Sequence, residues 1–314
     1  MMYVLRYHGL VPVPVDVDPK TLAVNVELLK EAVTDRTKMI VIAHIFGSRC
    51  PLHEVLEVAR NHDLLVVEDC AQAFMGIQYM GEDRADVSMF SFGTIKTATS
   101  FGGAIIHVKN LVVLEEMRRR ERRYPCHTNV SFFKKLMKYG VLHGISTPAL
   151  YGLFIHACRA IGADHDKVIT LAIRGFSGGE LVPLIRYRPS MALLGLMHRR
   201  LTCIDEQYIL LRKSKSEQLA TAVKDLPNVF IPGHHAEKHY YWLLPVCVPS
   251  PKEVRVFIVL AYVPSSLGRD HDPVHAKNIM ASLVYLPVTP ETPEWAIEKM
   301  TCCLRDALQS SSRL

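Results

Sequence analysis

The stretch between residues 66 and 106 constrains the fold of this chain more than any other part of the sequence. One apolar run ends in Asp69, and a second apolar run ends in Ser91. A lysine, Lys96, follows five residues later among small residues, and Gly102 then precedes a third apolar run. Short apolar runs bounded by polar residues and glycine are typical of buried strands. The stretch therefore predicts strand, acid, strand, lysine and strand, in that order.

The lysine and the acid also suggest a chemistry. Burial among apolar and small residues lowers the pKa of a lysine, which makes a free amine available to form a Schiff base with an aldehyde. An acid at the end of a neighbouring strand can hold a pyridine nitrogen protonated, so the pair indicates pyridoxal phosphate chemistry. Spacing alone leaves a second interpretation open: an ordinary α/β sheet in which Asp69 caps a helix and Lys96 is solvated.

The identities of the residues favour the first interpretation. Residues 68–76 read EDCAQAFMG, residues 90–96 read FSFGTIK, and two glycines follow at 102 and 103. This pattern resembles that of the DegT/DnrJ/StrS family of pyridoxal-phosphate-dependent sugar aminotransferases, which reads EDxAQAxG and then FSFxxxKxxxxxxGG. Two details differ, because the glycine of the first block comes one place late and the lysine loop is one residue shorter.

The resemblance implies a role for five positions. Lys96 would be the Schiff-base lysine, Asp69 would face the pyridine nitrogen, and Gln72 would approach the ring hydroxyl. Ala71 would pack against one face of the ring, and Ser91 would reach the phosphate. Lys96 and Asp69 are therefore the expected catalytic residues, and no metal is expected. A sibling reaction of the family, sugar deoxygenation, uses histidine in place of this lysine, so Lys96 argues against it.

The resemblance also implies a fold and an activity. The expected fold is α/β, the fold type I of pyridoxal-phosphate-dependent transferases, with a mostly parallel sheet sandwiched by helices in a large domain. That domain would cover residues 1–200, with a helical insert at about 124–190, and residues 201–314 would form a linker helix and a smaller α+β domain. The complete enzyme would be a homodimer that moves an amino group from an amino acid, typically glutamate, to a nucleotide-linked keto-sugar.

One departure from the family supports an alternative. Full-length members carry a further segment before the part that matches residues 11–18, and it includes a helix start that binds the cofactor phosphate. The sequence is therefore either a fragment of a longer protein or a shortened relative. In the second case it would be a catalytically impaired homologue that serves as a scaffold or subunit partner.

Several local elements can be predicted from the pattern. Residues 11–18 alternate valine with proline or aspartate, which predicts an edge strand, and residues 38–47 predict a buried parallel strand. Asn25 is the expected cap of a helix that follows it, and Pro51 is expected to open the next helix. A single long helix is expected from residue 191 to about 226.

Two segments raise the question of other partners. Five arginines fall within residues 118–123, which could indicate nucleic acid, but a solvated helical face is preferred because no nucleic-acid motif accompanies them. The apolar stretch 141–157 is shorter than the roughly twenty residues of a membrane span and is broken by glycine, proline and histidine. Helices that cover the active site or a dimer partner are preferred there over an interfacial membrane helix.

Composition sets the remaining expectations. Hydrophobic residues make up 49% of the 314, charged residues 22%, and the formal charge is +6, which is typical of a globular protein and only weakly suggests a polyanionic partner. The eight cysteines show no metal-binding spacing. We therefore expect reduced thiols, a cytoplasmic location, no nucleic acid and no membrane association.

Overall fold

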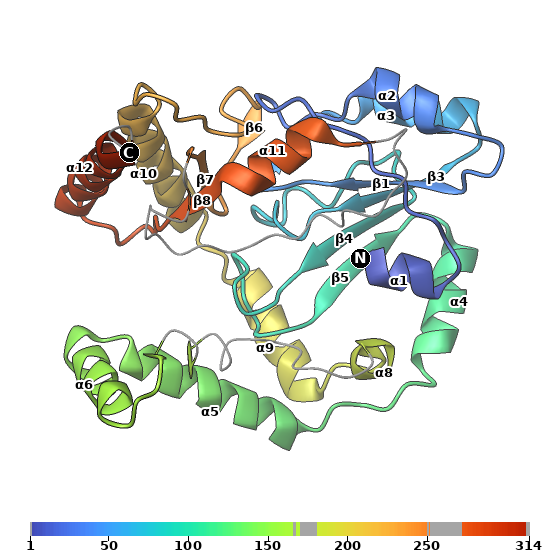
Figure 1. Ribbon diagram of the computed structural model, residues 1–314. Helices are drawn as coiled ribbons and strands as arrows, with labels where there is room; N and C mark the ends of the chain where they lie inside the picture. Colours follow the sequence, from blue (N-terminus) through green and yellow to red (C-terminus); the bar gives the residue numbers. More distant parts are fainter. Residues whose placement is uncertain (1, 166–167, 170–180, 250, 252–271, 312–314) are drawn as a thin grey trace.

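The computed structural model describes residues 2–165, 168–169, 181–249, 251 and 272–311 (Figure 1). Its central sheet has the strand order β1-β3-β4-β5. β1, β3 and β4 are parallel, and β5 runs antiparallel to β4. This confirms the predicted mostly parallel sheet and the strand expected after the lysine. The strands are β1 (Met39–Ala43), β3 (Leu65–Asp69), β4 (Val87–Ser91) and β5 (Ala104–Val108).

Two helices cover one face of this sheet. They are α2 (Val26–Ala32) and α3 (His53–Asn61), and their apolar side chains share a core with β1 and β3. As predicted, Asn25 caps α2, because its side chain accepts a hydrogen bond from the Leu28 amide at 3.1 Å. α3 begins at His53, two residues later than the expected start at Pro51.

The predicted edge strand at residues 11–18 is wrong. The structure has only a single bridge there, between Val17 and Val24. Pro12 and Pro14 have no amide proton, so this segment offers few donors to a neighbouring strand.

The predicted long helix at residues 191–226 is two helices. α9 (Met191–Thr202) ends before Cys203, and α10 (Glu206–Val223) begins after Asp205, whose side chain accepts a hydrogen bond from the Tyr208 amide at 3.1 Å. An aspartate that caps an amide in this way favours a new helix start over a continuous helix.

The C-terminal part of the chain forms its own core. β7 (Leu244–Cys247) and β8 (Leu283–Leu286) form an antiparallel pair, and every residue in both strands is buried. α10, α11 (Val274–Ser282) and α12 (Glu294–Ser311) surround this pair (Figure 1). A second pair, β2 (Ser48–Arg49) with β6 (Lys238–His239), links the first half of the chain to the second.

The remaining helices lie along other sides of the molecule (Figure 1). They are α1 (Met2–Tyr7), α4 (Leu111–Glu121), α5 (Asn129–Ile145), α6 (Pro148–Ala160) and α8 (Leu181–Ile185). The arginines of α4 form ion pairs with acids on the same exposed helix, such as Arg119 with Glu116 at 2.7 Å. This agrees with the predicted solvated face. A glycine-rich loop seen in the sequence at 175–179 lies outside the described residues.

Candidate functional site

Strand ends place the predicted residues at one edge of the sheet. Asp69 is the last residue of β3 and Ser91 is the last residue of β4, and the two parallel strands pair side by side. The carboxyl ends of parallel strands are the usual place for a ligand in such sheets. The Asp69 carboxylate accepts a hydrogen bond from the Ala71 amide at 2.9 Å, which orients the carboxylate at the start of the loop after β3.

Gln72 lies on the β1 side of this edge. Its side-chain oxygen accepts a hydrogen bond from the Phe46 amide at 2.9 Å, so the amide group is held in one orientation. Phe46 follows β1 and has a positive φ of 59°. Ala71 and Gln72 are both only partly buried, so a bound molecule could reach them.

Lys96 lies on the β4 side, in the turn that follows the strand. A Cβ atom at Gly93 would lie 3.8 Å from Ser91 Oγ and 3.9 Å from Lys96 Cγ, so both side chains border the same small residue. Burial lowers the pKa of Lys96, and the nearby Asp69 carboxylate partly opposes that shift. The structure therefore brings together an amine that loses its proton more readily than a solvated lysine, a carboxylate and a hydroxyl.

The lysine turn is held by two residues that the sequence did not indicate. The Lys96 ammonium lies 4.2 Å from the centroid of the Trp242 ring, and the ring nitrogen of Trp242 donates a hydrogen bond to the Ile95 carbonyl at 2.9 Å. Arg212 donates a hydrogen bond from Nη2 to Thr97 Oγ1 at 3.2 Å. Trp242 is one of only two tryptophans, but it follows Ile95 by 147 residues and no local pattern links the two.

Gly47 explains how Trp242 reaches the site. Gly47 has a φ of +93°, and a Cβ atom there would lie 2.3 Å from the Trp242 amide nitrogen. The Tyr240 amide donates to the Gly47 carbonyl at 2.9 Å, next to the β2–β6 pair. Only glycine allows the two backbones to approach this closely. The close approach brings the second half of the chain against the lysine turn.

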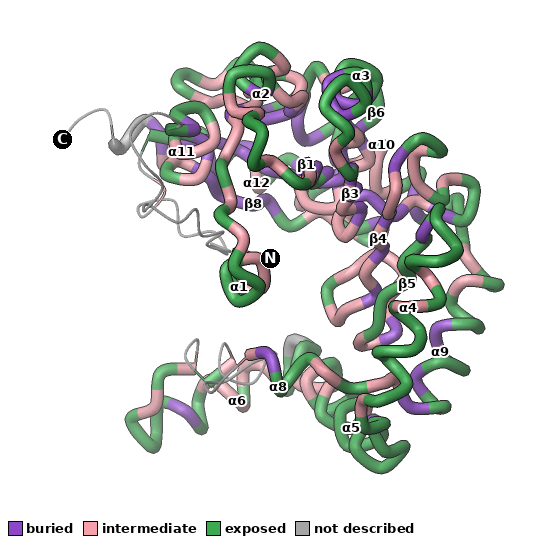
Figure 2. Tube along the Cα trace, turned by 90° about the vertical axis from the view of Figure 1, so that its right-hand side faces the viewer, coloured by how far each residue is buried: buried purple, intermediate pink, exposed green. Residues whose placement is uncertain are grey.

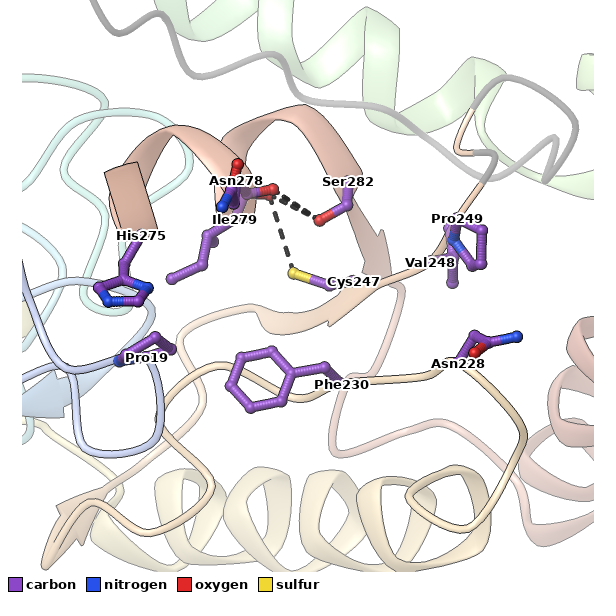
Figure 3. Close-up of a pocket in the computed structure, with 10 residues that line it drawn as sticks. All are labelled: Pro19, Asn228, Phe230, Cys247, Val248, Pro249, His275, Asn278, Ile279 and Ser282. Atoms are coloured by element: carbon purple, nitrogen blue, oxygen red, sulfur yellow. Dashed lines mark hydrogen bonds between the residues drawn. The ribbon is translucent and has the colours of Figure 1, made fainter. Parts of the chain in front are cut away.

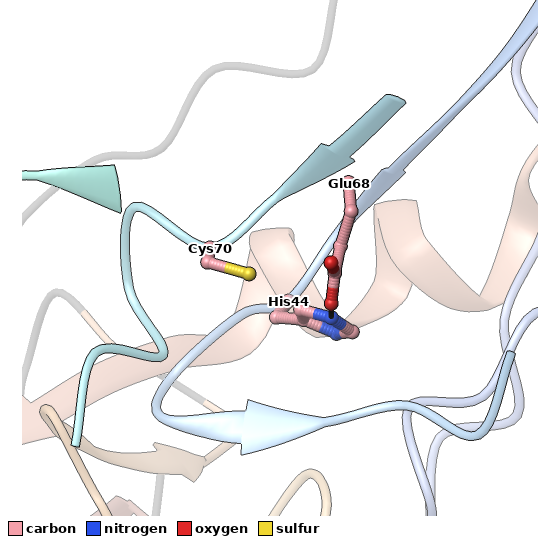
Figure 4. Close-up of side chains that lie close together, drawn as sticks. All are labelled: His44, Glu68 and Cys70. Carbon is pink, nitrogen blue, oxygen red and sulfur yellow. Dashed lines mark hydrogen bonds and ion pairs between the residues drawn. The ribbon is translucent and has the colours of Figure 1, made fainter. Parts of the chain in front are cut away.

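A buried polar network surrounds Glu68, the residue before Asp69, and Figure 4 shows Glu68 with its partner His44. The Glu68 carboxylate accepts hydrogen bonds from His44 Nε2 at 2.8 Å, the Ser88 hydroxyl at 2.7 Å, the Glu82 amide at 2.9 Å and the Tyr79 hydroxyl. Burial raises the pKa of Glu68, but these hydrogen bonds outweigh it and hold the pKa at about 2. The ionised carboxylate thus ties together β1, β3 and β4 at the edge where the candidate site lies.

His44, Glu68 and Cys70 could be taken for a metal site, because their ligand atoms all lie within 4.8 Å of one another. The hydrogen bonds favour a different role. His44 Nδ1 accepts from the Cys50 amide at 3.1 Å, so the ring proton is on Nε2 and points at Glu68. Burial raises the pKa of Cys70 far above its ordinary value, which keeps the thiol protonated. These hydrogen bonds give His44 a structural role, which is to join the end of β1 to Glu68 in β3.

A cavity of about 430 Å³ lies elsewhere, between β7, α11 and the loop at Pro19 (Figure 3). Two of its polar side chains already bond to backbone: the Cys247 thiol to the Ile279 carbonyl and the Ser282 hydroxyl to the Asn278 carbonyl. None of the five predicted residues lines it. We therefore place the candidate active site at the β3–β4 edge and not in this cavity.

Comparison with known proteins gives a family match over the first part of the chain and a fold over nearly all of it. The model of the DegT/DnrJ/EryC1/StrS aminotransferase family matches residues 2–140. A GDP-perosamine synthase from Escherichia coli O157:H7 is 35% identical over 105 residues, which are 32% of this chain and 29% of that protein. An L-glutamine:2-deoxy-scyllo-inosose aminotransferase from Micromonospora echinospora is 40% identical over 102 residues, 31% of this chain and 24% of that protein. The match thus spans less than a third of either curated relative.

Solved structures extend the likeness to nearly the whole chain. The aminotransferase TlmJ from Streptoalloteichus hindustanus superposes with a TM-score of 0.68 at 17% identity, over 99% of this chain and 76% of that chain. NtdA from Bacillus subtilis, crystallised with bound cofactor PMP, superposes with a TM-score of 0.63 at 16% identity, over 98% of this chain and 65% of that one. The expected fold of a pyridoxal-phosphate-dependent sugar aminotransferase is therefore confirmed.

Proposed function

Because residues 2–140 belong to the DegT/DnrJ/EryC1/StrS aminotransferase family, we propose that the chain is a pyridoxal-phosphate-dependent aminotransferase. It would take an amino group from an amino acid, with glutamate as the expected donor, and deliver it to a nucleotide-linked keto-sugar. One observation carries the proposal. The partly buried amine of Lys96, with its lowered pKa, lies at the same sheet edge as Asp69 and Ser91.

The residues at this edge fit pyridoxal phosphate. An amine that loses its proton readily suits the aldehyde, and a carboxylate at the end of β3 suits a ring nitrogen that must stay protonated. The Gln72 amide suits the ring hydroxyl, and the Ser91 hydroxyl suits a phosphate oxygen. These side chains are held in place by hydrogen bonds or by neighbouring strands, as described above.

Each residue then has a defined task. When bound, pyridoxal phosphate supplies an aldehyde and an electron-withdrawing ring. Asp69 holds the proton at the ring nitrogen, and its orientation is fixed by the Ala71 amide. Lys96 would be the nucleophile that holds the aldehyde, and as a free amine it would accept the proton from the α-carbon of the amino donor. Trp242 and Arg212 hold the turn that positions Lys96.

The names of the relatives support the substrate class. One relative is a GDP-perosamine synthase, whose name gives a nucleotide-linked product, and another is an L-glutamine:2-deoxy-scyllo-inosose aminotransferase, whose name gives amino transfer. Because the first relative has a nucleotide-linked product, we choose a nucleotide-linked keto-sugar as the acceptor. The proposal also includes a homodimer and a cytoplasmic location.

Cofactor capture by the purified chain tests the proposal. We expect pyridoxal phosphate to give a new absorbance band, and borohydride to fix a pyridoxyl group on the peptide that contains Lys96, identified by mass spectrometry. Lys96→Ala should lose the band and the label, whereas Lys299→Ala, at an exposed position on α12, should keep both. Absence of the label on the folded wild-type chain would overturn the proposal and favour the scaffold alternative.

A further inference from the structure

One face of helix α5 contacts Phe101 and Gly102, which lead from the lysine turn toward β5. Phe132 is buried, Tyr139 stacks on Phe101 with ring centroids 5.4 Å apart, and Lys135 Nζ would lie 3.5 Å from a Cβ atom at Gly102. Phe132, Lys135 and Tyr139 recur every three or four residues, so they form one stripe along the helix. This inner face touches the end of the lysine turn.

The opposite face of α5 is apolar and exposed. Val130, Phe133, Met137 and Val141 recur every three or four residues on the side away from Phe132, with relative exposures of 53% to 64%. Figure 2 shows α5 as mostly exposed, at the lower edge of the molecule. Helix α6 contacts α5 and adds two exposed leucines, Leu150 and Leu153. We call this surface, made of these six side chains, the outer face.

The helices that form the outer face carry basic side chains and no acidic ones. Lys134 and Lys138 lie beside the apolar stripe of α5, and both are exposed. The sequence has no aspartate or glutamate between Glu121 and Asp164, so neither α5 nor α6 carries an acidic residue. Helix α9, which packs against α5, has none either. An apolar surface flanked by lysines, on helices that carry no acidic residue, is complementary to an apolar layer under a negatively charged surface.

We propose that the outer face docks on an anionic lipid membrane. The aliphatic and aromatic side chains of α5 and α6 would enter the headgroup boundary, and the stems of Lys134 and Lys138 would carry their charges to the lipid phosphates. This proposal departs from the expectation that the chain does not associate with a membrane, because the structure exposes an apolar face on these helices.

Two observations define the kind of contact. No single helix in the described part of the chain is long and apolar enough to cross a membrane. Residues 129–145 and 149–160 meet that test only together, and they are bent by 96°. Such a bend suits helices that lie along a surface. A second copy docked on the same face is disfavoured, because a two-fold contact would bring the lysines of both copies together with no acid on α5 or α6 to pair them.

Vesicle sedimentation tests the proposal on the full chain. We expect it to sediment with vesicles of equal parts phosphatidylcholine and phosphatidylglycerol at low salt, and much less with phosphatidylcholine alone. Neutralising Lys134→Gln and Lys138→Gln together should lower the partition coefficient about twentyfold, because each lysine near an anionic surface contributes roughly a factor of five. Phe133→Ser with Met137→Ser should lower it at least about tenfold by removing apolar contact.

Matched variants on the opposite half of the chain serve as controls. Leu210→Ser on α10 and Lys299→Gln on α12 change equally exposed positions, so they should leave sedimentation unchanged. All variants should unfold at the wild-type temperature. Sedimentation that is insensitive to both outer-face variants would overturn the proposal. So would a change from dimer to monomer in the Phe133→Ser, Met137→Ser variant without any effect on vesicle binding, which would identify the outer face as a contact between copies.

Discussion

The imidazole of His44 donates its Nε2 proton to the Glu68 carboxylate at 2.8 Å, in a part of the sheet where neither side chain is exposed. Glu68 also accepts from Ser88 and from the Glu82 amide, so one buried charge joins three strands. Asp69 is the next residue along the chain. The network therefore positions the carboxylate that we assign to the cofactor nitrogen.

The low pKa of Glu68 predicts acid-dependent stability. Its pKa falls from 4.5 to about 2 on folding, so the folded state favours the ionised form. The resulting contribution, about 3 kcal/mol, is fully present above the unfolded pKa and is lost as pH falls toward the folded value. We expect the free energy of unfolding in urea to decrease on acidification from about pH 5 to about pH 2.

Glu68→Gln isolates this contribution. The variant should be less stable than the wild type at neutral pH, because its amide cannot accept all four hydrogen bonds, and its stability should depend less on pH over the same range. Glu121→Gln, at an exposed helix end, is the control and should keep the wild-type pH dependence. An equal loss of stability on acidification in Glu68→Gln and wild type would show that Glu68 does not carry the effect.

Trp242→Leu should weaken pyridoxal phosphate binding about thirtyfold, because it removes a cation–π contact and one hydrogen bond, each worth roughly 1 kcal/mol. In the structure, the cation–π contact is between the Trp242 ring and the Lys96 ammonium, and the hydrogen bond runs from the ring nitrogen to the Ile95 carbonyl. Titration of the absorbance band measures the loss. The other tryptophan, Trp295, is exposed on α12, and Trp295→Leu should bind like the wild type. Unchanged binding in Trp242→Leu would mean that the lysine turn keeps its position without the indole.

The central sheet could be predicted because its information is local. The runs that end in Asp69 and Ser91 have the length and apolar character of buried strands, and the glycines before β5 mark where that strand starts. The break between α9 and α10 was missed because apolar residues continue on both sides of it. Asp205 was the available signal, since its side chain can cap a helix that begins there.

The surroundings of Lys96 could be predicted only in part. The expected drop in its pKa follows from small and apolar neighbours in the sequence, and the structure agrees with it. Trp242 and Arg212 could not be predicted, because their contacts with the lysine turn depend on how the second half of the chain docks on the first. The cofactor roles of Lys96, Asp69, Ala71, Gln72 and Ser91, and the domain boundary near residue 200, stay predictions.

Asp69→Asn should make Lys96 more reactive at low pH toward a small reagent. Burial lowers the pKa of Lys96, and the Asp69 carboxylate raises it, so removal of that charge should lower the pKa further. Reductive methylation with formaldehyde requires the free amine, and its rate should therefore rise at a lower pH in the variant than in the wild type. Mass spectrometry of the Lys96 peptide across a pH series measures the midpoint.

Ser91→Ala is the control for this experiment. The serine borders the same glycine as Lys96 but carries no charge, so the midpoint should stay at the wild-type pH. A midpoint that moves to higher pH in Asp69→Asn, or does not move, would contradict the electrostatic coupling between Asp69 and Lys96.

Gly47→Ala should destabilise the fold by about 2 to 4 kcal/mol, since a methyl group there meets backbone and the residue must also keep a positive φ. The added Cβ would lie 2.3 Å from the Trp242 amide nitrogen, so the segment that carries Trp242 would have to move away from the lysine turn. Urea unfolding measures the stability, and quenching of tryptophan fluorescence reports the exposure of Trp242.

Gly195→Ala is the matched control, because nothing lies within 4 Å of its Cβ and it sits inside α9. That change should instead stabilise the protein by about 0.5 to 1 kcal/mol. A Gly47→Ala protein as stable as the wild type would show that the two backbones can move apart at Gly47 without a loss of stability. In that case, the contact at Gly47 does not hold Trp242 beside Lys96.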